Sequence, residues 1–121
     1  MPPWLREQLM NMQQAQQNLQ SIMVQKQQLD VERMETDRAL EELQKASDED
    51  TIYKHAGSVL VRYSRKDIVD ELEEKRMLAK TRHDVLEKQE ARLKESLKEQ
   101  EAKLNEAMRG QQAGPDPHQR K

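Results

Sequence analysis

Apolar residues recur at intervals of three and four along two long stretches of the chain, residues 4–45 and 65–109. This spacing gathers them on one side of an α-helix and is typical of a coiled-coil seam. The first stretch has two interleaved series: Leu5, Met12, Leu19, Lys26, Arg33 and Leu40, and Ala15, Ile22, Leu29, Thr36 and Leu43. The second stretch has one series, flanked by further apolar residues: Leu72, Ala79, Leu86, Leu93, Gln100 and Ala107, flanked by Ile68, Leu78, Val85, Leu97 and Leu104. The pattern predicts two long helices that fold back on each other as an antiparallel coiled coil.

The ends of the second helix are also visible in the sequence. Ser64 and Asp67 have the spacing of a capping box, with Ser64 as the N-cap residue, which predicts a helix start at residue 65. Gly110 predicts a stop after Arg109. We expect the polar, proline-containing residues 110–121 to form a disordered tail.

Between the helices, residues 51–64 have the chemistry of a short β-hairpin. Ile52 and Tyr53 form one group of strand-favouring residues and 58–63 a second, with a break predicted at 55–57. An isolated hairpin is marginally stable in water and exposes unpaired strand edges. We therefore expect other copies or a related chain to pair these edges, so that several hairpins close into a barrel-like sheet. A small core against the helix ends is the alternative use of these apolar residues.

Composition agrees with helices that bury only a narrow stripe. Of the 121 residues, 36% are charged, none is Phe, and the net charge of −2 comes from acidic and basic residues mixed along the chain. No basic block indicates nucleic-acid binding, and no apolar run or leader-like start indicates a membrane or secretion. The chain has no cysteine. We expect a soluble, intracellular protein.

Several apolar residues gather near the free ends of the predicted helices, where a coiled coil is usually polar. Leu5, Met12 and Leu104 occupy seam positions, for which core packing is the simpler interpretation. The others fall outside the seam or at its end: Trp4, Leu9, Met10 and Met108. Scattered surface apolar residues are common, but flexible methionines also suit a surface that binds many different sequences. All seven are candidate residues for binding other polypeptides.

The central module resembles the beta class of the prefoldin family. The shared pattern is an aromatic residue followed by Lys, a Gly three residues on, and a Val-Leu-Val strand that leads into a capped helix. It is matched by Tyr53, Lys54, Gly57, Val59, Leu60 and Val61 in IYKHAGSVLVRYSRKD, and the resemblance covers residues 4–109. His55 and Ala56 depart from it, because aliphatic residues are expected there.

The resemblance implies a fold, partners and a function. Prefoldin is a hexamer of two alpha-class and four beta-class subunits, whose hairpins form β-barrels that carry six coiled-coil arms. The arm tips hold unfolded proteins and deliver them to a group II chaperonin in the cytosol, without nucleotide. The oligomer-interface residues are then Ile52, Tyr53, Gly57, Val59, Leu60, Val61 and Tyr63. Rim contacts are expected from Tyr53, Lys54, Arg62 and Tyr63.

An enzyme is not expected. His55, His83 and His118 are too far apart for a metal pair on a helix, and His83 is interpreted as a surface residue. The carboxylates alternate with Lys and Arg, as on a solvated helix face, so no catalytic residue, cofactor or metal is predicted. Two functions therefore stay open: a holding chaperone that works without ATP, and a structural coiled-coil adaptor that recruits one folded partner.

Overall fold

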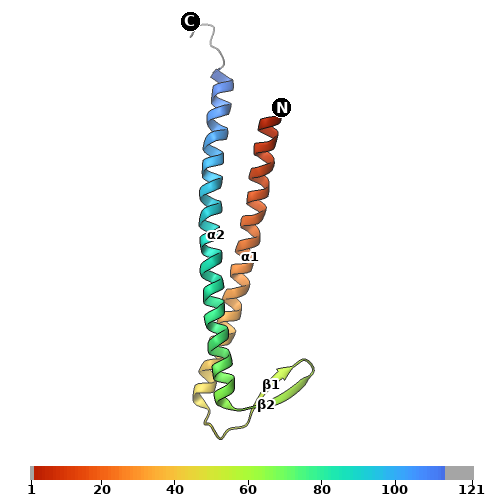
Figure 1. Ribbon diagram of the computed structural model, residues 1–121, viewed down its shortest axis with the longest axis vertical. Coiled ribbons are helices and arrows are strands. Elements are labelled where there is room, and N and C mark those ends of the chain that lie inside the picture. Colours follow the sequence, from red (N-terminus) through yellow and green to blue (C-terminus); the bar gives the residue numbers. More distant parts are fainter. Residues whose placement is uncertain (1, 114–121) are drawn as a thin grey trace. The chain divides into compact units, whose positions relative to one another are not determined.

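The computed structural model describes residues 2–113, and the side chains of residues 2–110. Its elements follow in the order α1 (Pro3–Lys45), β1 (Ile52–Ala56), β2 (Val59–Tyr63) and α2 (Arg65–Ala113) (Figure 1). Two long helices joined by an antiparallel β-hairpin were the elements expected from the sequence, and this prediction is confirmed.

The helices contribute to two compact units. One unit holds residues 25–86, which include the end of α1, the hairpin and the start of α2. The other unit holds residues 1–24 and 87–121, of which the structure describes 2–24 and 87–113. In residues 25–86 the two helical segments run in opposite directions, and ion pairs bridge them from Glu32 to Lys75 and from Asp37 to Arg76.

The predicted seam of α1 is confirmed position by position. Every member of its two series is buried or half-buried, while most residues between them are exposed. Thr36 is a buried polar seam residue, and its hydroxyl donates to the Glu32 carbonyl 2.8 Å away on the same helix. Because that hydrogen bond satisfies the hydroxyl, Thr36 can occupy the seam without leaving a buried polar group unpaired.

The seam of α2 differs from the prediction at two positions. Ile68, Ala79 and Leu86 are buried as expected, but Leu78 and Val85 are exposed. Each of these two precedes a buried residue by one position, and one residue turns an α-helix by about 100°, which moves the side chain off the seam. The corresponding seam positions are occupied by His83 and Glu90, which are both half-buried.

His83 was therefore wrongly interpreted as a surface residue. Its side chain is 18% exposed, and Nε2 lies 3.9 Å from Oδ1 of Asp30 on α1. The spacing of three between His83 and the buried Leu86 places the imidazole on the same side of α2 as the seam.

The hairpin has a tighter turn than the sequence suggested. His55 and Ala56 belong to β1 and pair with Leu60 and Val59, so the predicted break at 55–57 is wrong. The loop is only Gly57 and Ser58, and Gly57 has a φ of +66° while no non-glycine residue described has a positive φ. A positive φ at the first loop residue alone is the requirement of a type II′ turn, which joins strands with the natural twist.

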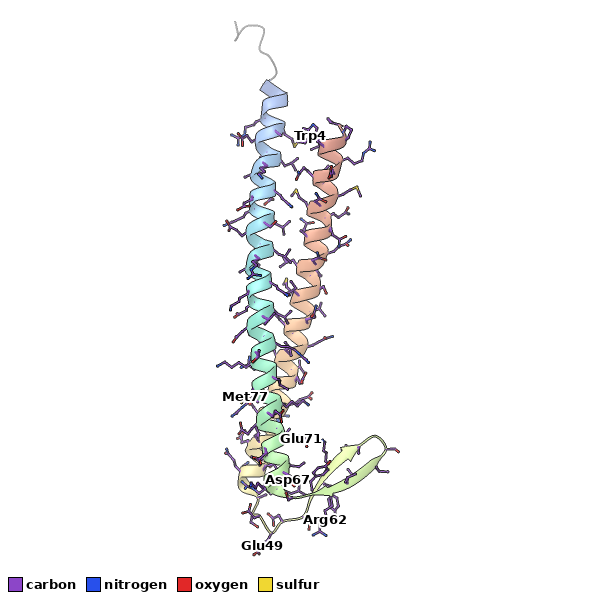
Figure 2. All side chains as sticks on the ribbon, in the orientation of Figure 1. Trp4, Glu49, Arg62, Asp67, Glu71 and Met77 are labelled. Atoms are coloured by element: carbon purple, nitrogen blue, oxygen red, sulfur yellow. The ribbon has the colours of Figure 1, made fainter. Side chains whose placement is uncertain are left out.

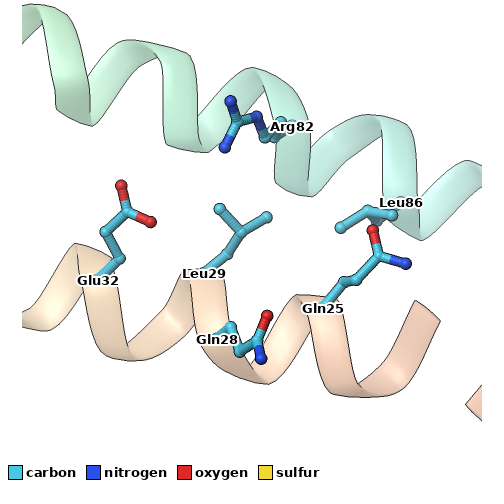
Figure 3. Close-up of a pocket in the computed structure, with 6 residues that line it drawn as sticks. All are labelled: Gln25, Gln28, Leu29, Glu32, Arg82 and Leu86. Atoms are coloured by element: carbon cyan, nitrogen blue, oxygen red, sulfur yellow. The ribbon is translucent and has the colours of Figure 1, made fainter. Parts of the chain in front are cut away.

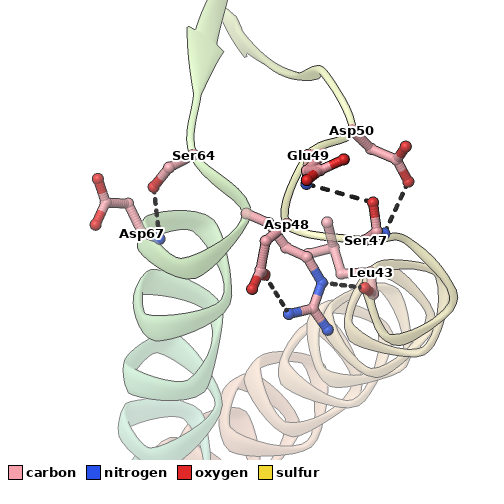
Figure 4. Close-up of polar contacts among 8 residues, drawn as sticks. Leu43, Ser47, Asp48, Glu49, Asp50, Ser64 and Asp67 are labelled. Carbon is pink, nitrogen blue, oxygen red and sulfur yellow. Dashed lines mark hydrogen bonds and ion pairs between the residues drawn. The ribbon is translucent and has the colours of Figure 1, made fainter.

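Hydrogen bonds mark the start of each helix, and the start of α2 has a side-chain cap. The Leu5 and Arg6 amides donate to the Pro2 carbonyl at 3.1 Å, and Pro3 occupies the first helical position, where its missing N–H is not needed. At α2 the Asp67 amide donates to the Ser64 hydroxyl at 3.1 Å (Figure 4), which confirms Ser64 as the N-cap residue.

The end of α2 lies beyond the predicted stop. The helix continues through Gly110 to Ala113. Gly110 lacks the positive φ of a glycine C-cap, and a helical glycine costs only about 1 kcal/mol relative to alanine, so it does not by itself end a helix. The remaining part of the expected disordered tail, residues 114–121, lies outside the described residues.

Candidate interaction surfaces

The hairpin presents two different faces. Register and alternation place six residues on one face, here called the apolar face: Ile52, Lys54, Ala56, Val59, Val61 and Tyr63. The opposite face mixes apolar and polar residues: Tyr53, His55, Leu60 and Arg62. Lys54 is the only charged member of the apolar face.

The apolar residues of the hairpin are mostly open to solvent. Val59 and Leu60 are each 58% exposed although they belong to opposite faces, and Tyr53 and Val61 are also exposed. Ile52 and Tyr63, at the base of the hairpin, are half-buried. The small core against the helix ends, considered above as an alternative, is therefore not formed by Val59, Leu60 and Val61.

The edges of the hairpin are also open. In the described part of the chain β1 and β2 make a two-stranded sheet, so the outer edge of each strand has no strand beside it. Together with apolar residues on both faces, these edges form a surface suited to strand addition from another chain.

One charged contact ties the apolar face to a helix. The Lys54 ammonium pairs with the Glu71 carboxylate on α2, and Lys54 Nζ also lies 5.4 Å from the centre of the Tyr63 ring. The hydrogen bond to Glu71 raises the pKa of Lys54 above its ordinary value. This pair could not be predicted from the sequence, because the two residues are 17 positions apart, outside any local spacing rule.

A second set of exposed apolar side chains lies in the unit that holds the chain ends. Trp4, Leu9, Met10 and Met108 are exposed, and this set is here called the distal cluster (Figure 2 labels Trp4 in the first turn of α1). Leu5, Met12 and Leu104 are half-buried. The seven candidates thus divide as their seam positions suggested, with three turned toward the seam and four open to solvent.

Further exposed apolar residues, not anticipated from the sequence, lie on the helices within residues 25–86. They are Val31, Met34, Met77, Leu78 and Val85. Their exposure could have been predicted from their spacing, because none of the five lies at a buried position of the seam.

A small hollow lies between the helices within residues 25–86. It measures about 150 Å³, and Figure 3 shows the residues that line it: Gln25, Gln28, Leu29, Glu32, Arg82 and Leu86. This is smaller than the roughly 300–1,000 Å³ of ordinary ligand pockets. Its lining offers one carboxylate and no histidine or hydroxyl group, so it lacks the paired groups of acid–base or nucleophilic catalysis.

These features define a class of protein: a coiled-coil chain with a solvent-exposed β-hairpin between its helices, built for contacts with other polypeptides. No helix in the described residues carries an apolar stretch long enough to span a membrane. A family model described as "Prefoldin subunit" matches residues 6–111. The chain belongs to the prefoldin family.

Two relatives at 38% identity are named as beta subunits. The prefoldin subunit beta of Archaeoglobus fulgidus is 38% identical over 95 residues, which is 78% of this chain and 82% of that protein. The prefoldin subunit beta of Thermoplasma acidophilum is 38% identical over 96 residues, or 78% and 77% of the two chains. The chain is therefore a prefoldin chaperone subunit, similar over most of its length to proteins named as beta subunits.

Solved structures show the same fold. The crystal structure of the prefoldin beta subunit from Thermococcus strain KS-1 matches with a TM-score of 0.79 and 35% identity, covering 89% of this chain and 95% of that one. The beta2 subunit from the same strain matches with a TM-score of 0.66 at 23% identity, which supports the fold alone.

Proposed function

We propose that this subunit works within a hexamer that holds unfolded proteins without ATP and delivers them to a group II chaperonin in the cytosol. Hairpins of alpha-class and beta-class subunits join through their open edges into a β-barrel platform. The distal cluster contacts unfolded clients, and no step of the cycle is a reaction catalysed by this chain.

Exposure of the distal cluster is the observation that carries this proposal. Trp4 is 44% exposed and Met10 is 62% exposed, on turns of α1 where polar residues would satisfy a coiled coil equally well. Unfolded proteins expose apolar side chains, and flexible methionines adapt to many shapes. Weak contacts at several subunits of one complex add through avidity, so a small cluster on each chain is sufficient.

The assembly part of the proposal is supported by the hairpin. Two exposed faces and two open edges leave apolar groups and backbone hydrogen-bonding groups unused in the single chain. Strand pairing between subunits uses both at once. The interface residues proposed are Ile52, Tyr53, Gly57, Val59, Leu60, Val61 and Tyr63.

Light scattering of a chemically unfolded client tests the holding function. The client is diluted, without ATP, into the complex of this chain with an alpha-class prefoldin subunit. We compare the natural chain with a variant that carries serine at every position of the distal cluster. A matched control carries serine at four exposed apolar residues of the other unit: Val31, Met34, Met77 and Leu78.

The expected result is that the natural complex and the control suppress aggregation, whereas the distal variant does not, while all three have the same native mass. If no complex suppresses aggregation although assembly is normal, the holding function fails. The structural adaptor then becomes the better account of the same surfaces.

A further inference from the structure

The hairpin is fixed to the helices by very few polar contacts. Thr51 and Ser64 are the residues that link its strands to the rest of the chain, and rotation at these links would swing both strands together. Among the described residues, the Lys54–Glu71 pair is the one salt bridge that joins a strand to a helix. Glu71 lies in the second turn of α2, close to the base of the hairpin (Figure 2).

Lys54 is held from two directions. Its ammonium pairs with Glu71 and lies over the Tyr63 ring on the neighbouring strand, a cation–π arrangement. One side chain therefore contacts β2 and α2 at the same time. A rotation of the hairpin away from α2 would break the ion pair while leaving the strand pairing intact.

The same contact also supplies a counter-charge for the Lys54 ammonium. A partner that covers the apolar face would remove water from Lys54, and an ammonium without a counter-charge is costly to bury. Glu71 supplies that counter-charge from the same chain. The apolar face can then be covered without demanding an acidic residue from the partner.

We propose that Lys54 is a positioning residue for subunit assembly, whose contact with Glu71 fixes the angle of the hairpin on α2 and neutralises the apolar face. This inference rests on the proposed assembly through hairpins. A closed assembly constrains the angle of each hairpin, so a small loss of order in each copy of this chain is repeated around the assembly. Exposed ion pairs contribute little to folding stability, so the contact acts on orientation and not on the stability of the helices.

The angle can be measured in the full-length chain. Because the protein has no cysteine, Ser58→Cys in the hairpin turn and Lys80→Cys on α2 provide two unique positions for spin labels. Pulsed electron paramagnetic resonance then gives the distribution of distances between them. We expect Lys54→Gln and Glu71→Gln each to broaden this distribution, and the exchanged pair Lys54→Glu with Glu71→Lys to narrow it again.

The matched control is Lys45→Gln. Lys45 also forms an exposed ion pair, 3.5 Å from Glu42, but both residues lie on α1. This substitution should leave the distance distribution unchanged. A distribution that is equally narrow in the natural chain and in both single variants would overturn the proposal.

Native mass spectrometry with an alpha-class subunit tests the consequence. Each single variant should weaken assembly by about thirtyfold or more, the lower end of the effect of truncating one partner of a covered ion pair. The exchanged pair should recover most of this loss, and circular dichroism should show unchanged helix content. Assembly of the single variants at natural strength would overturn the positioning role.

The failure of the proposed function would look different. A natural chain that does not join the alpha-class subunit overturns hairpin assembly itself, and the positioning role falls with it. The distance distributions from the chain alone still report whether Lys54 and Glu71 fix the hairpin angle.

Discussion

The guanidinium of Arg65 donates through Nε to the Leu43 carbonyl at 2.7 Å, joining the first residue of α2 to the last turn of α1 (Figure 4). The same carbonyl accepts from the Ala46 amide at 3.2 Å, and Nη1 of Arg65 lies 3.2 Å from Asp48. Carbonyls in the last turn of a helix lack partners within the helix, so Arg65 satisfies one of them while closing the connection. The contact places the Leu43 carbonyl beside the start of α2.

Replacing Arg65 should therefore destabilise the closed end of the coiled coil. We expect Arg65→Ala to lower the free energy of unfolding by about 1–2 kcal/mol, because a hydrogen bond from a charged donor is lost at a partly exposed site. Urea unfolding followed by circular dichroism at fixed chain concentration measures this. The exposed neighbour Lys66→Ala is the control and should change the stability by less than about 0.5 kcal/mol. An equal effect of both substitutions would contradict the role of Arg65.

The difference in burial between Leu86 and Leu78 can be tested by the same substitution, leucine to alanine, at each position. Leu86 is 8% exposed and Leu78 is 60% exposed. Leu86→Ala should lower the free energy of unfolding by about 2–4 kcal/mol, the range for a buried leucine in a thin core. Leu78→Ala should cost less than about 0.5 kcal/mol. Thermal and urea unfolding of the full chain measure both, and the reverse order would place the seam on the other side of α2.

Replacing Gly57 should destabilise the hairpin turn. A Cβ at this position would meet nothing within 4 Å, so crowding does not oppose alanine there. The positive φ does, and alanine in that conformation costs about 1–2 kcal/mol. We expect Gly57→Ala to disorder the hairpin and Gly57→Asn to disorder it less, as observed in amide NMR signals of residues 52–63. Unchanged signals in the alanine variant would contradict this turn geometry.

The seam position Gln100 carries a polar atom without a partner. Its Oε1 is buried and has no hydrogen-bond partner among the described residues. Gln100→Leu should raise the free energy of unfolding by about 1 kcal/mol, because the unsatisfied acceptor is removed and apolar area is added. The exposed Gln89→Leu is the control and should have little effect on urea unfolding. If Gln100→Leu does not raise the free energy of unfolding, this oxygen is hydrogen-bonded in solution.

Much of the fold follows from spacing along the chain. Residues such as Leu29 and Leu40 could be placed in the seam because their neighbours three and four positions away share their side of the helix. Leu78 and Val85 were placed wrongly because hydrophobicity was weighed above spacing. Arg65, Lys54 and His83 could not be paired with their partners, since such contacts depend on the register between two distant segments.

The candidate surfaces were predictable to different degrees. Apolar residues at the chain ends and in the hairpin stood out because coiled coils and hairpins rarely need them there. The difference between the two hairpin faces was not predictable, because it depends on extending β1 through His55 and Ala56. Strand propensity is strongly context-dependent, and here His55 and Ala56 pair with the strand-favouring residues Leu60 and Val59.

The Arg65–Leu43 contact also bears on the order in which the chain folds. It joins residues separated by 22 positions, and seam residues farther from the hairpin are joined across progressively longer stretches of chain. Closing a short loop loses less entropy than closing a long one, so the helices should begin to pair beside the hairpin and zip outward. During synthesis on the ribosome, the first turns of α1 then wait, unpaired, until nearly the whole chain has emerged.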